Sequence, residues 1–329
     1  MVTRRCNARC GMCHIWQDKH SPMLSVDEIR GIFAENDFAA LRTVSLTGGE
    51  PTLRSDLPQV LEAVLAGAPN ARELRLATNA LLPKRLVQQV EKCWDVARPR
   101  GISRFTVQIS LDGIGEIHDQ VRGIEGAFER VQEALHQLVD LQQSISGLSL
   151  ALSAVVQQAN AAHIASLQNY AKDLRVPLYL SPIVTSLDYY ANPDAVDALS
   201  VTDDQVPQDL FDRLARTAQG ALGFHYQDVA DMLRGRDRRR PCMMGYHAFV
   251  LEANGDVHPC VNCEQVMFGN LLKRSFRDIW WGKRARQLRQ ELHQGCCPSC
   301  TALCYLGFSN VGELIAAGMA RLRGEASES

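Results

Sequence analysis

Three cysteines lie within eight residues near the start of the sequence, at Cys6, Cys10 and Cys13 in the stretch "RRCNARCGMCHIW" (4–16). Structural zinc sites are usually closed by four ligands, and His14 is too close to Cys13 along the chain to complete a good tetrahedron. A cubane iron–sulfur cluster has its irons at separate corners, so three cysteines of one loop can each bind a different iron. The spacing therefore favours a cluster with one iron open to an outside ligand.

The remaining cysteines are unevenly distributed. Cys93 stands alone on an apparent helix and is interpreted as an inert buried thiol. Disulfides are disfavoured in the cytosol, so clustered cysteines there indicate metal binding or catalysis. Seven further cysteines form a second group near the C-terminal end: Cys242, Cys260, Cys263, Cys296, Cys297, Cys300 and Cys304.

The composition is that of an ordinary globular protein, with 329 residues, 46% of them hydrophobic, and a formal net charge of −2. There is no charge excess to suggest nucleic-acid binding, and the short basic run at 234–241 is expected to be a solvated loop. The sequence has no apolar stretch long enough to span a bilayer and no secretory signal pattern. We therefore expect a cytoplasmic protein with neither a nucleic-acid nor a membrane partner.

The cysteine groups must be positioned by the elements between them. Amphipathic helical segments follow short apolar runs, with a capping box at Ser25 and Glu28, a helix opening at Pro83, and helical spacing over 127–139. This alternation predicts a parallel sheet with right-handed crossovers. The five expected strands are 42–50, 73–80, 105–113, 148–156 and 176–184.

The segment before Cys6 would be a sixth strand, placed first in the sheet. It is short, so either this strand is stunted or the true start lies upstream. We expect a barrel domain over 1–185, a helical bridge over 186–240, a cysteine-rich module over 241–310, and a C-terminal helix and tail over 311–329. The clearest helix of the module is expected at 276–293.

The N-terminal motif resembles that of a known family. Cys6-x3-Cys10-x2-Cys13 is similar to the signature of the radical S-adenosylmethionine (SAM) enzymes. The resemblance implies a partial (β/α)6 TIM-like barrel in which these cysteines hold a [4Fe-4S] cluster and SAM binds the open iron. It also implies reductive cleavage of SAM to a 5′-deoxyadenosyl radical, with electrons from a reductase such as flavodoxin or ferredoxin. Met12 departs from the aromatic residue usual at its position.

The ends of the expected strands carry further resemblances. Gly48, Gly49 and Glu50 in "TGGEP" resemble the family motif that receives the methionine ammonium, although an isolated motif of this kind is usually an ordinary strand-to-helix turn. The resemblance implies further SAM contacts near the ends of the strands expected at 73–80 and 105–113, which are the third and fourth strands when the N-terminal segment is counted first. The alternative for each is a turn residue or a surface arginine. These candidates are Thr78, Asn79, Ser110, Asp112 and Arg122.

The second cysteine group resembles the SPASM or twitch modules that follow many radical SAM domains, and implies one auxiliary [4Fe-4S] cluster. Cys242 and Cys260 are the expected ligands, with two more from Cys297, Cys300 and Cys304. Cys263 and Cys296 remain open as ligands of a second cluster, hydrogen-atom donors or buried thiols. By spacing alone, a zinc ribbon is the alternative.

Three functions remain open. The first is a radical SAM enzyme acting on a small polar substrate such as a sugar, aminocyclitol or nucleoside intermediate. The short segment before Cys6 contains no peptide-binding domain, and the apparently single auxiliary cluster also favours this hypothesis. The second is a maturase that crosslinks or epimerises a ribosomally made peptide. The third is a non-catalytic protein that binds zinc or a partner.

Overall fold

The computed structural model describes residues 1–301 except 19, 188, 202–204, 239–241, 264–265 and 293–299. Cys296, Cys297, Cys304 and the expected C-terminal helix and tail at 311–329 lie outside the described residues. Among the described helices, none is long and apolar enough to cross a membrane.

A parallel five-stranded sheet forms the centre of the molecule, with the strands in the order of the sequence. Each strand begins within about two residues of the first residue expected for it. The apolar runs predicted these strands because a sheet covered by helices buries nearly every side chain along its length. The strands are β1 (Thr43–Leu46), β2 (Glu73–Thr78), β3 (Arg104–Ser110), β4 (Leu148–Val156) and β5 (Leu178–Pro182).

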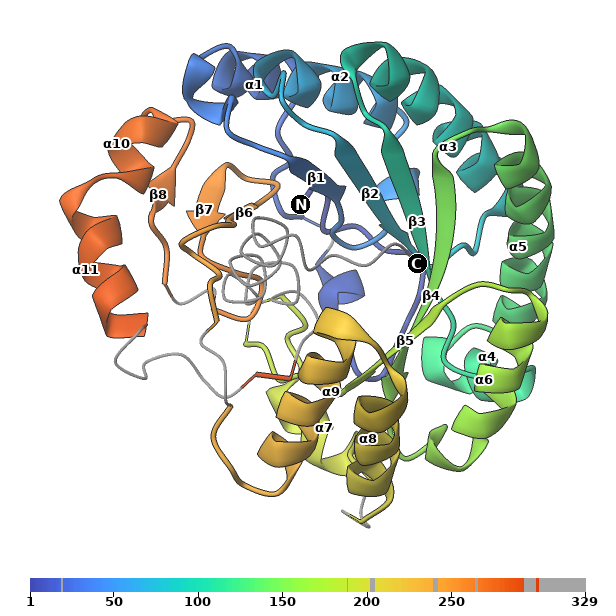
Figure 1. Ribbon diagram of the computed structural model, residues 1–329. Coiled ribbons are helices and arrows are strands. Elements are labelled where there is room, and N and C mark those ends of the chain that lie inside the picture. Colours follow the sequence, from blue (N-terminus) through green and yellow to red (C-terminus); the bar gives the residue numbers. More distant parts are fainter. Residues whose placement is uncertain are drawn as a thin grey trace, which may run out of the picture.

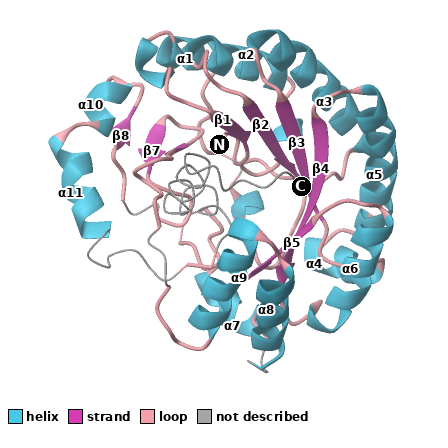
Figure 2. Ribbon diagram, viewed as in Figure 1, coloured by secondary structure: helices cyan, strands magenta, loops and turns pink. Residues whose placement is uncertain are grey.

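The sheet forms the inner wall of a partial barrel, and helices cover its outer side (Figures 1 and 2). The expected capping box is present, because Ser25 and Glu28 bond reciprocally at the start of the first helix. Pro83 opens the third helix as predicted. The covering helices are α1 (Val26–Phe33), α2 (Leu57–Gly67), α3 (Pro83–Ala97), α4 (Glu116–Arg122), α5 (Ala127–Ser144) and α6 (Ile164–Asp173). The expected α/β class with a barrel-like parallel sheet is confirmed.

The N-terminal segment, where the sixth strand was expected, pairs with the two residues that directly follow β1. Val2 N donates to Thr47 O at 2.8 Å, and Thr3 forms a parallel bridge with Gly48. This pairing is too short to count as a regular strand. It nevertheless places the following cysteines at the carboxyl ends of the strands, where parallel sheets carry their functional groups.

Three further helices follow β5: α7 (Pro193–Leu199), α8 (Gln205–Thr217) and α9 (Gly220–Leu233). The basic run after α9 is partly ion-paired. Arg234 bonds to Asp212 of α8, and Arg236 lies 3.3 Å from Asp231 of α9. These pairs anchor the start of the loop to the helices behind it.

The cysteine-rich module contains a small antiparallel sheet, β6 (Val250–Leu251), β7 (Asp256–His258) and β8 (Gly269–Asn270). Gly255, with a φ of +93°, makes the turn before β7. The prediction of a single helix over 276–293 is wrong. Two helices occupy this stretch, α10 (Phe276–Trp280) and α11 (Lys283–Glu291), because Gly282 adopts an extended ψ of 163° between them.

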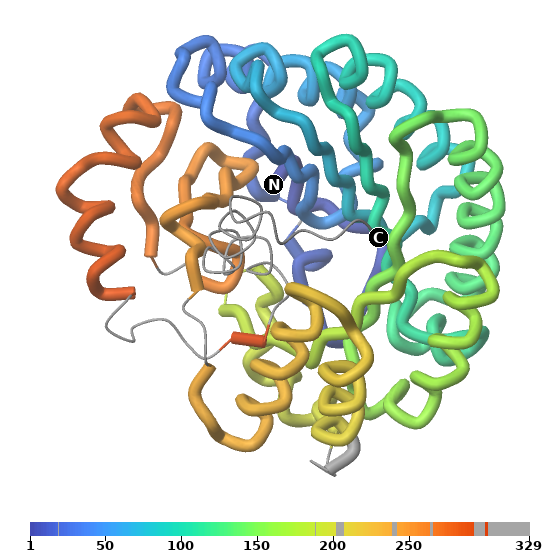
Figure 3. The backbone as a smooth tube through the Cα atoms, in the orientation of Figure 1, coloured from blue at the N-terminus to red at the C-terminus, as the bar shows by residue number. Residues whose placement is uncertain are grey.

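The module packs beside the first helices of the barrel (Figure 3). Phe276 of α10 lies 4.6 Å, ring centre to ring centre, from Phe38, and Phe249 also joins this aromatic cluster. Leu24 N donates to Ala253 O at 2.7 Å across the same boundary. Apolar contacts and main-chain hydrogen bonds thus hold the module against the barrel.

Candidate functional site at the N-terminal cysteine loop

Cys6, Cys10 and Cys13 share one largely apolar environment. Cys10 is 6% exposed and packs with Met12 and Val121, while Cys6 and Cys13 are half-buried at the edge of the same cluster. Burial raises the pKa of Cys6 to about 11 and that of Cys13 to about 12, and it also raises the pKa of Cys10. Mutual repulsion between the sulfurs contributes to the rise at Cys6 and Cys13.

This environment fits an iron–sulfur cluster by its donor chemistry. Three thiolates gathered in an apolar site are unfavourable unless a cation compensates their charge, and metal ligation deprotonates a thiol outright. Within the described residues, no three His, Cys, Asp or Glu side chains are arranged as a ready-made metal site. The fit therefore rests on three soft sulfur donors that one loop brings into the same apolar cluster, the ligand type that iron–sulfur clusters require.

Gly48 and Gly49 allow the N-terminal segment to approach the end of β1. A Cβ at Gly48 would lie 2.1 Å from Thr3 O, and one at Gly49 would lie 2.3 Å from Arg5 O. Gly49 N and Glu50 N donate to these same two carbonyls at 2.9 and 2.8 Å. The glycines were expected to admit a ligand; in the structure, the main chain that leads into the cysteine loop occupies this side of them.

Glu50 is buried, and its side chain connects the ends of β1 and β2 through hydrogen bonds. Its side chain is 1% exposed and accepts hydrogen bonds from Thr52 N, Thr52 Oγ1, Thr78 Oγ1 and Asn79 N at 2.6–3.1 Å. Burial raises the pKa of this carboxyl. Four donors from the chain already engage the carboxylate that was expected to meet a cationic group. These hydrogen bonds tie the two strand ends together, and the SAM contact implied for Glu50 stays a prediction.

Asn79 connects the end of β2 to the first cysteine. Its Nδ2 donates to Asn7 Oδ1 at 2.8 Å and lies 3.6 Å from Cys6 Sγ. Its Oδ1 accepts from Leu81 N at 3.1 Å, which fixes the orientation of the amide. Ala80 adopts a φ of +56°, a left-handed conformation that is unfavourable for alanine. The turn after β2 is thus shaped around the cysteine loop.

Asp112 and Arg122, expected to contact SAM, are paired with each other in the structure. Arg122 Nη2 lies 2.5 Å from Asp112 Oδ2, and Arg122 Nη1 donates toward Cys10 Sγ at 3.6 Å. Both side chains are buried, with exposures of 10% for Arg122 and 0% for Asp112. Ser110 ends β3 nearby and is half-buried.

Sequence reasoning did not identify the segment that closes over the cysteine loop after β5. Tyr189 Oη donates to Gly48 O at 3.1 Å, and Asn192 Nδ2 donates to Met12 O at 2.8 Å. His14 N donates to Tyr190 O at 2.6 Å. Burial raises the pKa of Tyr189. No motif marks these residues, and their position just after a strand end was the only signal available.

The described part of the C-terminal module brings some of its cysteines together. Cys263 N donates to Cys260 O at 3.4 Å within one turn, and both thiols are buried. Asn262 Nδ2, in that turn, donates to Cys300 Sγ at 3.2 Å, while Cys242 is half-buried at the start of the module. Cys260, Cys263 and Cys300 therefore belong to one neighbourhood.

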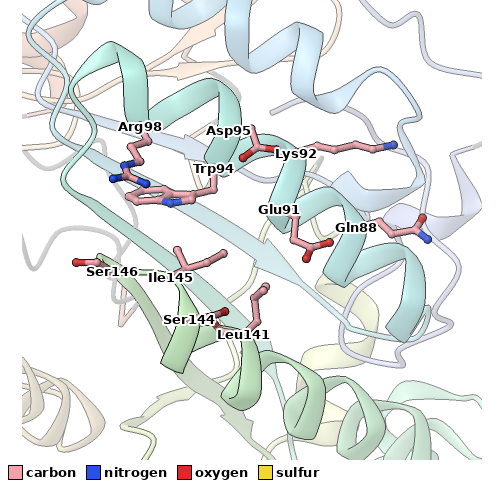
Figure 4. Close-up of a pocket in the computed structure, with 10 residues that line it drawn as sticks. All are labelled: Gln88, Glu91, Lys92, Trp94, Asp95, Arg98, Leu141, Ser144, Ile145 and Ser146. Atoms are coloured by element: carbon pink, nitrogen blue, oxygen red, sulfur yellow. The ribbon is translucent and has the colours of Figure 1, made fainter.

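A separate surface groove of about 660 Å³ lies between α3 and the end of α5. Trp94, Arg98 and Ile145 are among the residues that line it (Figure 4). None of its lining residues belongs to the cysteine loop or to the strand ends described above. It is not part of the candidate site. Cys93, on the neighbouring face of α3, is fully buried as expected.

Comparison with protein families identifies two regions. The model of the radical SAM superfamily matches residues 1–152, and that of the SPASM iron–sulfur cluster-binding domain matches residues 242–305. Residues 1–152 therefore form a domain of the radical SAM superfamily, and residues 242–305 form a SPASM domain. The two domains imply the cofactors expected from the sequence, SAM and [4Fe-4S] clusters.

Curated relatives differ in how much of this chain they match. The mycofactocin maturase MftC of Mycolicibacterium smegmatis is 28% identical over 316 residues, which cover 91% of this chain and 74% of MftC. The GTP 3′,8-cyclase of Acidothermus cellulolyticus is 32% identical over 187 residues, 52% of this chain and 46% of the cyclase. The chain spans only 41% of the length of the Fe-coproporphyrin III synthase of Methanosarcina barkeri.

Solved structures share the fold. Streptococcus suis SuiB bound to S-adenosylmethionine superposes with a TM-score of 0.61 at 16% identity, covering 88% of this chain and 66% of SuiB. Native anSMEcpe with bound AdoMet gives a TM-score of 0.58 at 18% identity, covering 87% of this chain and 80% of that one. The barrel and the C-terminal module thus occur together in proteins of this architecture.

Proposed function

We propose that this protein is a radical SAM maturase that modifies a ribosomally made peptide. The similarity to MftC carries the proposal, because it extends over 91% of this chain and so includes both the barrel and the SPASM region. The cyclase similarity is higher in identity but covers only 52% of the chain. These coverages favour the peptide hypothesis over the small-molecule substrate that the sequence alone favoured.

The fold is compatible with this substrate class. SuiB has been solved bound to its precursor peptide SuiA, and anSMEcpe with the Kp18Cys peptide. Both proteins share the architecture of this chain with TM-scores of 0.60 and 0.59. Other proteins with this architecture therefore bind peptides.

In this proposal, Cys6, Cys10 and Cys13 hold the [4Fe-4S] cluster, and bound SAM supplies a 5′-deoxyadenosyl radical when an external reductase provides an electron. The chain's own part is to bind and orient. Gly48 and Gly49 hold the loop against β1, Glu50 and Thr78 tie the strand ends together, and Asn79 contacts Cys6. Ser110 lies at the neighbouring strand end. The apolar shell around Cys10 excludes water from a reactive intermediate.

The auxiliary cluster is proposed to use Cys242, Cys260 and Cys300 from the described residues, with Cys297 or Cys304 as the fourth ligand. The hydrogen bond from Asn262 to Cys300 Sγ supports the inclusion of Cys300. Cys263 lies in the same turn as Cys260 and is a candidate for a further ligand or a hydrogen-atom donor, as is Cys296. A flavodoxin or ferredoxin is the proposed electron donor.

Two measurements test this function. Iron and sulfide are determined after anaerobic reconstitution of the wild type and a Cys6/Cys10/Cys13→Ala variant; about eight irons falling to about four are expected for two cubanes. Formation of 5′-deoxyadenosine is then measured with any short peptide found to be encoded beside the gene, with the SuiA precursor peptide, and with a panel of sugars and nucleosides. A mass change in the peptide supports the maturase, whereas turnover of a panel member alone overturns it. Zinc in place of iron, unchanged in the variant, would overturn the enzyme itself.

A further inference from the structure

Arg122 is attached to the cysteine loop by both its main chain and its side chain. Arg9 N, next to Cys10, donates to Arg122 O at 2.9 Å. The following residue, Gly123, approaches the same loop so closely that a Cβ there would lie 2.5 Å from Arg9 O. The end of α4 is thus held against the loop, and the guanidinium has little freedom to move away from Cys10.

The guanidinium has two different partners on its two terminal nitrogens. Nη2 pairs with Asp112 Oδ2 at 2.5 Å, while Nη1 lies 3.6 Å from Cys10 Sγ, within the range of a hydrogen bond to sulfur. A lysine ammonium lacks this planar fork and could not present two fixed donors in the same way. The positive end of the ion pair is therefore turned toward the thiol.

Asp112 is itself held on several sides. Its Oδ1 accepts from Val155 N at 2.9 Å, and its main-chain N–H donates to His118 Nδ1 at 3.1 Å. Asn160 Nδ2 donates to the carbonyl of Asp112 at 2.8 Å. The end of β4, the turn that follows it and helix α4 thus hold Asp112 in place at the end of β3, and its carboxylate in turn fixes Arg122. The Arg122–Asp112 ion pair is therefore a buried pair held in a fixed geometry, unlike a solvated ion pair on the surface.

We propose that the buried Arg122–Asp112 pair sets the reduction potential of the iron–sulfur cluster bound by Cys10. Arg122 is a positioning residue that acts through this thiolate, and the inference rests on the cluster in the proposed function. Reduction adds negative charge to a cluster, so a nearby cation stabilises the reduced form and raises the potential. Asp112 opposes this effect, and burial strengthens both contributions because the local dielectric is low.

The two charges have opposite expected effects. Arg122→Gln removes the cation and makes the cluster harder to reduce, whereas Asp112→Asn removes the opposing anion and makes it easier to reduce. A variant with both changes loses the whole pair and is expected to lie between the two single variants. A purely structural role would instead shift both single variants in the same direction, or simply reduce the cluster content of both.

The test is a redox titration of anaerobically reconstituted protein without SAM, followed by the electron paramagnetic resonance of the reduced cluster. Arg122→Gln is expected to lower the reduced-to-oxidised ratio at a fixed potential about tenfold, which is about 59 mV for a one-electron couple. Asp112→Asn is expected to raise the ratio severalfold. Arg100→Gln is the control, because Arg100 forms an exposed pair with Glu62 at 2.7 Å far from the loop.

Several outcomes overturn the inference. Unchanged ratios in both single variants, together with weaker SAM binding by calorimetry in Arg122→Gln, would show that Arg122 binds SAM instead. If Arg122→Gln fails to assemble the cluster, Arg122→Lys and Asp112→Asn decide the matter, since Arg122→Lys keeps the charge and should stay within about threefold of wild type. A wild type with no cluster at Cys10 would overturn the proposed function as well, whereas a normal cluster with unshifted variants would overturn this inference alone.

Discussion

The carboxylate of Glu50 accepts a hydrogen bond from the main-chain N–H of Asn79 at 2.7 Å, and so joins the carboxyl end of β1 to that of β2. Asn79 in turn lies 3.6 Å, through Nδ2, from Cys6 Sγ. A buried carboxylate thus reaches the cysteine loop through one intervening residue. Its contribution is to position the loop, and it can be measured as stability.

Glu50→Gln is expected to destabilise the fold by about 2 kcal/mol, because an amide nitrogen would then face donors that now bond to a carboxylate. The free energy of unfolding is measured by urea titration. Glu62→Gln is the matched control, since Glu62 is an exposed partner of Arg100 and its change should cost less than about 0.5 kcal/mol. Equal effects of the two substitutions would contradict the positioning role.

Gly49→Ala is expected to disrupt the attachment of the cysteine loop, because the new Cβ would lie 2.3 Å from Arg5 O. The cost should be about 1–3 kcal/mol, accompanied by a lower iron content after reconstitution. Gly31→Ala in α1 is the control. Its Cβ would meet no atom within 4 Å, and the change should stabilise the helix by about 0.5–1 kcal/mol. Full iron loading of Gly49→Ala would show that the close approach is dispensable.

Cys6→Ala is expected to abolish 5′-deoxyadenosine formation while leaving the auxiliary cluster in place. Two cysteines of the loop would remain, too few to hold the radical cluster in the proposed arrangement. Iron content and SAM cleavage are measured together. Cys93→Ala serves as control, because this thiol is fully buried in α3 outside either cysteine group and its loss should not change the iron content. Continued cleavage of SAM by Cys6→Ala would refute the ligand assignment.

Tyr189→Phe removes the hydroxyl that donates to Gly48 O at 3.1 Å. The loss of this hydrogen bond should cost about 1 kcal/mol of stability and weaken SAM binding. Tyr226→Phe makes a matched comparison, because Tyr226 Oη bonds to Leu180 N at 3.2 Å away from the cysteine loop. We expect a similar loss of stability there with unchanged SAM affinity, measured by calorimetry. A weaker affinity in both variants would point to a general loosening of the barrel.

His118 makes the stability depend on pH. Burial lowers its pKa from 6.5 to about 4, so the folded state binds this proton less readily than the unfolded state does. Its contribution is fully present above pH 6.5 and is lost progressively as the pH falls toward 4. Between pH 8 and 5 the loss is about 2 kcal/mol.

The measurement compares urea unfolding at pH 8, 6.5 and 5 for wild type, His118→Gln and the control His136→Gln, whose imidazole is exposed. The His118→Gln variant should show a shallower decline below pH 6.5, because glutamine can still accept from Asp112 N but does not titrate. The control should follow the wild type. Three parallel profiles would mean that His118 does not titrate differently in the folded and unfolded states.

Much of the framework followed from local pattern. Five apolar runs predicted five strands because each strand of a covered parallel sheet is apolar along its length. The capping box at Ser25 and the proline at 83 predicted two helix starts for reasons confined to a single turn. The helix over 276–293 failed because its pattern continues through Gly282, where the backbone leaves the helix.

The sequence by itself determined which residues could bind a cluster, since thiol chemistry and the spacing of Cys6, Cys10 and Cys13 are local properties. Only the tertiary structure decided what surrounds them. Tyr189 reaches Gly48 across 141 positions of sequence, and Arg122 reaches Cys10 across 112. Such contacts depend on where the sheet places distant strand ends, and no local pattern encodes that placement. The resemblance implied a SAM contact for Arg122, and only the fold revealed that Asp112 is paired with it.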